Sequence, residues 1–251
     1  MTLALFYVDH SELRPVGGTV ELAGDEGNHA VRVKRVRVGE QLLIGDGNGR
    51  VVCAEVSEIV GKQRLRAQVL EVVDHARPAT EITVIQGLIK GERMDRCLET
   101  LTESGVDRIR LWSATRSIAK LDPARALGKF ETKVIQASKQ ARRAYVPQLE
   151  LITDLEATVR DSNGPVLVLD EEADEPLSAL LPAGSEVAQV TIIVGPEGGI
   201  DDSERERLRA AGGQLASMGP VILRASTAGT VAAGWVMGAT GRWRVQHLSD
   251  E

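Results

Sequence analysis

A buried strand that stops at a glycine-rich loop constrains this chain more than any other feature. The β-branched, apolar run from Val190 to Val194 is typical of a strand buried on both faces. It ends at the loop Gly195–Gly199 (GPEGG), and the segment from Asp201 onward favours a helix. Because glycine lacks a Cβ atom, this loop lets the backbone approach a ligand closely. The order strand, glycine loop, helix predicts a ligand site in an α/β protein.

The loop does not follow the common phosphate-binding patterns. Its spacing is neither GxGxxG nor GxxxxGK[ST], and no lysine follows that could reach a β- or γ-phosphate. A dinucleotide or P-loop site is therefore a poor interpretation. A tight loop that binds no ligand is the alternative that this stretch alone leaves open.

Two further strand ends favour a ligand. Residues 214–230 read as a short strand, a Met-Gly-Pro turn at 218–220, and Ile222 to Arg224 leading into a helix of small residues. The run 166–173 reads as a strand that ends in carboxylates, with Asp170 and Glu171 as candidates for the pocket rim and a solvated acidic turn as the alternative. Ligands gather beyond the carboxyl ends of strands in an open α/β sheet, so these segments can form one pocket.

Composition restricts the class of protein. With 251 residues and 43% hydrophobic residues, the chain can form one large domain or two unequal ones. The net charge of −6 is the wrong sign for coating nucleic acid, so an RNA site needs local basic patches. Cys53 and Cys97 form no CxxC or Cys/His cluster, so we expect no metal.

We expect a cytoplasmic protein with no membrane segment. Two lone thiols suit a reducing compartment. No stretch approaches the length of a membrane span, and the N-terminus reaches Asp9, His10 and Glu12 too soon for a signal peptide.

Residues 1–74 are predicted to form a small β-barrel domain. Short apolar segments alternate there with glycine turns. The exception is 28–39, a helix or strand in which Arg32, Lys34, Arg35 and a fourth cation interleave with valines. This basic stripe either faces phosphates or is a solvated surface, and the residues alone favour neither.

A boundary is expected at 75–79, where Pro78 discourages either neighbour from continuing. Strands and helices alternate from 80 to 242, which predicts a mostly parallel sheet covered on both faces. Within this second domain, 78–251, the range 122–143 is predicted to form a helix with a basic face. Basic helix faces usually serve solubility, and this one is also a candidate RNA surface.

The C-terminal motifs carry a resemblance. GPEGG at 195–199, MGP at 218–220 and ILR at 222–224 resemble, in order and spacing, the signature of the RsmE family of SPOUT methyltransferases. His29, Val33, Arg35, Gly39 and Asp46-Gly47 are similar to the pattern of that family's PUA-like domain. The chain departs from the family where Thr100, Ser104, Thr115, Lys139, Ala225 and Ser226 replace a lysine, a leucine, an acid, a glutamate, a threonine and a glutamate.

The resemblance implies a fold and a reaction. The expected fold is α/β, with a PUA-like β-barrel domain (1–74) and a trefoil-knotted SPOUT domain (78–251) that forms a homodimer. The expected reaction is methyl transfer from S-adenosylmethionine to N3 of a uridine in 16S ribosomal RNA of the small subunit. A SPOUT enzyme acting on transfer RNA or 23S RNA is one alternative, and a non-catalytic RNA-binding or assembly protein is another.

Site residues follow from the resemblance and from the chemistry. Arg224 is predicted to stabilise the uracil anion, or else to form a structural ion pair with Glu197. Proton acceptance is left open between Glu197, Asp170 and water. The candidate cofactor ligands are Leu169, Val194, Gly195, Pro196, Glu197, Gly198, Gly199, Met218, Gly219, Pro220, Ile222, Leu223 and Thr227. The candidate RNA-binding residues are Arg32, Lys34, Arg35, Lys90, Arg93, Arg116, Lys139, Arg142 and Arg143.

Overall fold

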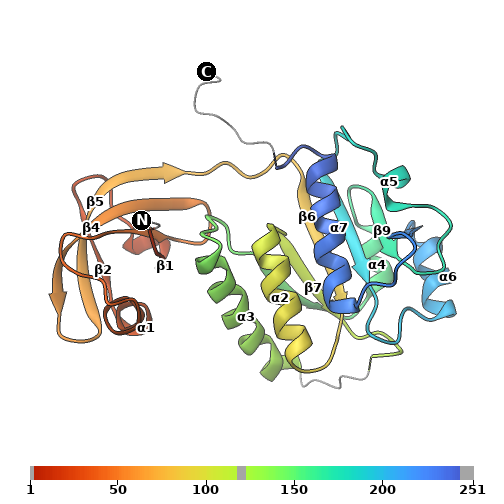
Figure 1. Cartoon of the computed structure of the whole chain (residues 1–251), viewed down its shortest axis with the longest axis horizontal. Coiled ribbons are helices and arrows are strands. Elements are labelled where there is room, and N and C mark those ends of the chain that lie inside the picture. The colour runs from red at the N-terminus through yellow and green to blue at the C-terminus, as the bar shows by residue number, and fades with distance from the viewer. Residues whose placement is uncertain (1–2, 118–122, 244–251) are drawn as a thin grey trace. The chain divides into compact units, whose positions relative to one another are not determined.

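The computed structural model describes residues 3–117 and 123–243. By its internal contacts the chain divides into two compact units. The N-terminal unit contains Met1–Arg77 and Ile135–Val146, and the C-terminal unit contains Pro78–Val134 and Pro147–Glu251. Both units are drawn in Figure 1.

The N-terminal unit is built on one five-stranded sheet with the order β1-β3-β4-β5-β2. Only β1 and β3 pair in parallel, and two register shifts interrupt the long pairing of β4 with β5. Alternate residues of these strands, such as Val52, Ala54 and Val56, are buried in one core. The strands are β1 (Leu5–Tyr7), β2 (Thr19–Leu22), β3 (Gln41–Gly45), β4 (Arg50–Val60) and β5 (Arg64–Asp74).

The basic segment of this unit is helical. A short 3-10 helix, η1 (His10–Glu12), comes first; later, α1 (Gly24–Asn28) continues into the π-helix η2 (His29–Lys34). The π-helix ends at Arg35, whose φ of 55° is left-handed. The sequence predicted either a helix or a strand for 28–39, and the structure shows a helix as far as Lys34.

The segment Ile135–Val146 groups with the N-terminal strands, although the predicted ranges placed it in 78–251. Backbone hydrogen bonds explain this grouping: Gly49 N donates to Ala144 O (3.0 Å) and Val146 N donates to Gly47 O (2.9 Å). The Tyr7 hydroxyl also donates to Arg143 O (2.6 Å). Such pairings between distant segments leave no trace in local sequence patterns.

The C-terminal unit contains one parallel sheet of six strands in the order β11-β9-β10-β6-β7-β8. The predicted mostly parallel sheet is confirmed. The strands are β6 (Glu81–Gly87), β7 (Arg108–Trp112), β8 (Gln148–Ile152), β9 (Val166–Leu169), β10 (Gln189–Val194) and β11 (Gln214–Ala216). The helices are α2 (Glu92–Ser104), α4 (Leu155–Arg160), α5 (Leu177–Leu180), α6 (Asp202–Ala210), α7 (Ala225–Ala239) and the first part of α3 (Pro123–Gln140). From Ile135 on, α3 belongs to the N-terminal unit. The first residue of the helix predicted at 122–143 lies outside the described residues.

Helices cover both faces of this sheet (Figure 1). On one face α2 and α7 pack together, and a Cβ at Gly229 would lie 3.3 Å from side-chain atoms of Leu101 and Val84. On the other face, α4 and α6 contribute Leu155 and Leu208 to a core with Ile85. The neighbours Val84 and Ile85 therefore point to opposite faces, as alternation along a buried strand requires.

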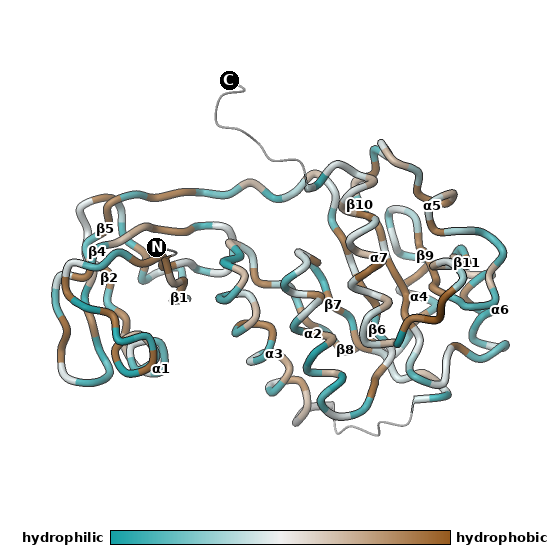
Figure 2. Tube along the Cα trace, viewed as in Figure 1, coloured by the Kyte–Doolittle hydropathy of each residue, from teal (hydrophilic) through white to brown (hydrophobic). Residues whose placement is uncertain are grey.

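The segment that leads into α7 is apolar. Figure 2 shows brown, apolar chain between β11 and α7. Val221 and Ile222 in this segment are 67% and 79% exposed, so two aliphatic side chains face solvent there. Within the described residues, no helix is both long and apolar enough to span a membrane.

Candidate active site

A cavity of about 950 Å³ lies at the carboxyl ends of β9 and β10 in the C-terminal unit. The GPEGG loop and the 217–224 loop both line it, so the predicted convergence of the two loops is observed. Twelve of the candidate cofactor ligands border the cavity: Leu169, Val194, Gly195, Pro196, Glu197, Gly198, Gly199, Met218, Gly219, Pro220, Ile222 and Leu223. Thr227 is exposed and does not line it.

Two glycines shape the GPEGG loop. A Cβ at Gly87, the last residue of β6, would lie 2.7 Å from Pro196 N, so the loop crosses this strand end at backbone contact distance. Gly199 has a φ of 73°, in the left-handed region that glycine adopts without strain. The absence of a side chain at position 87 allows the close approach, and the absence of one at position 199 allows the turn.

The loop leads into the capped N-terminus of α6. The Asp201 side chain accepts from Glu204 N (2.8 Å), and the Glu204 side chain accepts from Asp201 N (3.1 Å). The Glu204 N–H and the Ser203 hydroxyl lower the pKa of Asp201 to about 2, because both donate to its ionised form. This capping box fixes where the loop ends and the helix begins.

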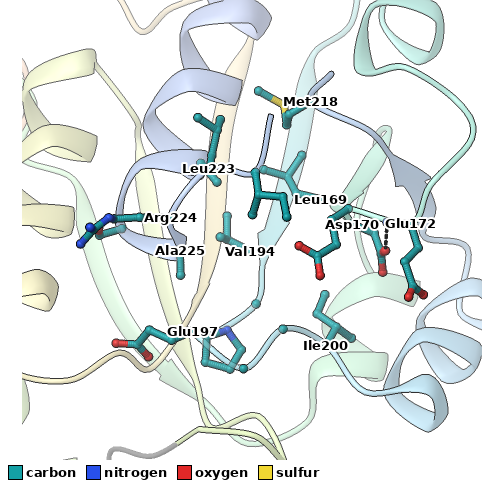
Figure 3. A pocket seen from close by; sticks show the side chains of 18 of the residues that line it. Leu169, Asp170, Glu172, Val194, Glu197, Ile200, Met218, Leu223, Arg224 and Ala225 are labelled. Carbon is teal, nitrogen blue, oxygen red and sulfur yellow. Dashed lines mark hydrogen bonds between the residues drawn. The ribbon is translucent and has the colours of Figure 1, made fainter. Parts of the chain in front are cut away.

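Arg224 borders the cavity directly before α7 and is exposed. Among the described residues its guanidinium has no hydrogen bond and no ion pair, so the predicted alternative of a structural ion pair with Glu197 is wrong. Glu197 accepts instead from Lys90 N (3.3 Å). Figure 3 shows Arg224 and Glu197 at one end of the cavity, and Asp170 and Glu172 at the other. An unpaired cation at a cavity is available to an anionic ligand.

Asp170 is occupied at the opposite end. Its side chain is 3% exposed, and it accepts from Arg205 Nε (2.7 Å) and from Glu172 N (2.8 Å). Arg205 also pairs with Glu172 (3.0 Å) and Asp202 (2.9 Å). Since two donors already hold this carboxylate, Glu197 and water are better candidates for proton acceptance.

The candidate RNA-binding residues fall into three groups. Arg93 and Arg116 border the cavity and are exposed, with Lys90 exposed beside Glu197. Arg32, Lys34, Arg35 and Arg142 are exposed on the N-terminal unit. Arg143 is half-buried there, and its Nε donates to Tyr145 O (3.0 Å).

Lys139 is engaged elsewhere. Its Nζ lies 2.5 Å from Glu26 Oε1, and the two side chains are 15% and 24% exposed. This ion pair offsets the charge of Lys139 within the N-terminal unit, which argues against its predicted role in phosphate binding.

Several cavity residues escaped the sequence reasoning. Arg205 is one of them: its partner Asp170 follows β9 and is far from it in the sequence. The further cavity residues that the sequence reasoning did not single out for the pocket are Ile89, Glu172, Ile200, Asp202, Ser217, Val221, Ala225, Ser226 and Ala228. These residues line the cavity because the strand order of the sheet brings their segments together.

Three departures from the family pattern have local explanations. Thr100 and Thr230 share a hydrogen bond of 2.8 Å between α2 and α7. The Ser104 hydroxyl donates to Leu101 O (2.9 Å) in the last turn of α2. Thr115 donates to the buried carboxylate of Glu204. Each substitute is therefore hydrogen-bonded within the fold.

Comparisons with known proteins agree with this geometry. Residues 76–237 match a family model described as an RNA methyltransferase domain, and residues 22–70 match an RNA methyltransferase PUA domain. The fold and site thus define an RNA methyltransferase with a PUA-like N-terminal domain. The ribosomal RNA small subunit methyltransferase E of Mycobacterium bovis is 39% identical over 97% of this chain and 94% of its own length. The chain belongs to the RsmE family.

More distant relatives match most of the chain. The Bacillus subtilis protein of the same name is 28% identical over 84% of this chain and 86% of its own. A Neisseria gonorrhoeae ribosomal RNA small subunit methyltransferase E, crystallised with S-adenosyl methionine, superposes with a TM-score of 0.83 at 28% identity, over 94% of this chain and 97% of that one. A methyltransferase of Legionella pneumophila with the same bound cofactor gives 0.84 at 27%, over 95% and 98%.

Proposed function

We propose that this protein transfers the methyl group of S-adenosylmethionine to N3 of a uridine in 16S ribosomal RNA. The observation that carries the proposal is the convergence of two backbone loops on one cavity beside the unpaired Arg224. The related enzymes named for the small ribosomal subunit support the choice of RNA.

The cavity suits an adenosyl group. Its volume falls within the range of roughly 300–1,000 Å³ common for small-molecule sites. Leu169 and Val194 offer apolar surface to a flat ring, while the glycine loops offer backbone N–H and C=O groups to its edge. No lysine follows the loop, which fits a nucleoside without phosphates. When bound, the cofactor supplies an activated methyl group on a sulfonium centre.

The chain's own residues would then activate the uracil. N3 of uracil carries a proton that must leave before or during methyl transfer. Arg224, a permanent cation with a planar fork of donors, would stabilise the anion that forms. Glu197, at the same end of the cavity, or water would accept the proton (Figure 3). Arg93 and Arg116 would hold the phosphates that flank the target nucleotide, and this positioning supplies much of the rate.

The N-terminal unit would bind phosphates of the RNA. Arg32, Lys34 and Arg35 are exposed on and after the π-helix, with Val33, 63% exposed, between them. Phosphate contacts of this kind give affinity and register without sequence readout. We further propose that the substrate is presented within the small subunit, in the cytoplasm.

We also propose that the protein acts as a homodimer. Val231 and Trp235 on α7 are 44% and 39% exposed, although the rest of that helix is largely buried. Apolar side chains on one helix face are a common basis for association between copies. Sedimentation analysis tests this point.

Mass mapping of ribosomal RNA from cells that lack the protein tests the proposed reaction. One methyl group on a 16S uridine should disappear, and the wild-type gene should restore it. Purified protein with labelled cofactor should then modify 16S RNA in preference to transfer RNA or 23S RNA. Intact 16S methylation in the deletion strain would reject the proposal, and calorimetry without heat from S-adenosylmethionine would indicate a non-catalytic binder.

A further inference from the structure

A buried carboxylate joins two loops at the rim of the cavity. Glu204 in α6 is 5% exposed and accepts three hydrogen bonds. Its Oε1 accepts from Thr115 N (2.8 Å) and from the Thr115 hydroxyl (3.0 Å), and its Oε2 accepts from Asp201 N (3.1 Å). This one side chain therefore holds both the end of the GPEGG loop segment and the loop 114–117.

The residue after Thr115 contacts the glycine loop directly. Arg116 Nη1 donates to Gly198 O (3.2 Å), and a Cβ at Gly198 would lie 3.0 Å from the Arg116 Cβ. Ala114 N donates to the Ser117 hydroxyl (3.1 Å), which closes the 114–117 loop on itself. Arg116 thus borders the cavity, and its guanidinium is hydrogen-bonded to the GPEGG loop.

Separating these loops would leave the Glu204 carboxylate without its hydrogen-bond donors. A buried carboxylate that loses its hydrogen-bond donors is costly. The GPEGG loop and the 114–117 loop are therefore expected to move together. A ligand that orders the glycine loop would also order the guanidinium of Arg116.

We propose that Glu204 is a positioning residue that couples the GPEGG loop to Arg116, so that cofactor binding and RNA binding strengthen one another. This inference rests on the proposed function, since it takes S-adenosylmethionine and RNA as the two ligands. Linkage makes the coupling reciprocal, and couplings of this kind typically change affinity about 5- to 150-fold. Loss of Glu204 should weaken the coupling more than it weakens binding of the cofactor alone.

The test measures the affinity for transcribed 16S RNA by fluorescence anisotropy, with and without saturating S-adenosylhomocysteine. This product-side ligand occupies the cavity without turnover. For the wild type we expect roughly tenfold tighter RNA binding with the ligand present. In Glu204→Gln the amide must face one N–H donor with its own NH₂ group, so the enhancement should fall to about one- to twofold.

Two further variants separate coupling from stability. Thr115→Val keeps the backbone bond and loses the hydroxyl bond, so an intermediate enhancement is expected even if Glu204→Gln does not fold. Glu206→Gln, on an exposed position of the same helix, should keep the full enhancement. The same enhancement in the wild type, in Glu204→Gln and in Thr115→Val would overturn the inference. No enhancement in a wild type that binds the cofactor and methylates RNA would overturn it as well. A wild type that binds no cofactor would overturn the proposed function itself.

Discussion

Arg205 and Asp170 form an ion pair that closes one end of the cavity. Arg205 Nε lies 2.7 Å from Asp170 Oδ2, and the two side chains are 18% and 3% exposed. The pair joins the end of β9 to the first turn of α6, which directly follows the GPEGG segment. It thereby fixes the distance between two of the segments that line the cavity.

Removing the arginine should destabilise the protein. In Arg205→Ala the Asp170 carboxylate stays enclosed and loses its cation, and breaking such a buried pair costs about 3 kcal/mol or more. Arg209→Ala, at an exposed position of the same helix, should change the free energy of unfolding by less than about 0.5 kcal/mol. Urea unfolding measures both. Similar values for the two variants would show that the pair does not stabilise this end of the cavity.

The unpaired arginine should act on chemistry and not on cofactor binding. Arg224→Ala should lower kcat about 10²- to 10³-fold, the loss typical of one stabilising donor to a developing anion. The calorimetric Kd for S-adenosylmethionine should stay within about twofold, because Arg224 is predicted to act on the uracil and is not among the candidate cofactor ligands. Arg96→Ala, an exposed arginine of α2, serves as the control. Normal turnover by Arg224→Ala would remove this residue from the mechanism.

The glycine at the end of β6 should be needed for the cavity. In Gly87→Ala the new methyl group would lie 2.7 Å from Pro196 N and 2.9 Å from Gly195 C, so the GPEGG loop must shift. We expect at least about tenfold weaker cofactor binding, equal to about 1.4 kcal/mol. Gly128→Ala in α3 meets nothing within 4 Å and should stabilise the helix by about 0.5–1 kcal/mol. Calorimetry and thermal unfolding distinguish the two effects.

The sequence predicted most of the elements that carry the site because their signals are local. The run 190–194 and the loop 195–199 appear where apolar patterning and glycine spacing placed them. The β6 strand (Glu81–Gly87) opens the alternation predicted from residue 80, because it is buried along almost its full length and reads as one apolar run. Periodicity and turn chemistry depend on neighbours in the chain, so one sequence suffices to detect them.

The rest depends on contacts between distant residues. Asp170 had comparable weight as a rim residue and as a solvated turn, and the sheet order β11-β9-β10 brings Arg205 against it. Lys139 was placed on a basic helix face, and Glu26, its partner, precedes it by more than a hundred residues. Strand order and long-range pairing are not encoded in any short pattern, so neither pair was predicted.

The second of these pairs leads to a prediction on RNA binding. Lys139→Glu should destabilise the N-terminal unit by about 2 kcal/mol or more, because it sets two carboxylates together at a largely buried site. Adding Glu26→Lys should restore most of that stability. The salt dependence of RNA binding should keep its slope in the double variant, whereas Arg35→Ala should reduce it by about one. If the double variant and Arg35→Ala reduced this slope equally, Lys139 would be an RNA-binding residue.

The two thiols should differ sharply in reactivity. Cys97 is 1% exposed, and burial raises the pKa of its thiol to about 12, so only about 10⁻⁴ of it is thiolate at pH 8. Burial also raises the pKa of Cys53, but its side chain is only half-buried. A disulfide reagent such as dithionitrobenzoate should therefore titrate Cys53 slowly in the native protein and both thiols at once in guanidinium chloride. Cys53→Ser should leave no thiol that reacts without denaturant; a rapid reaction of Cys97 in that variant would mean that α2 opens readily from the sheet.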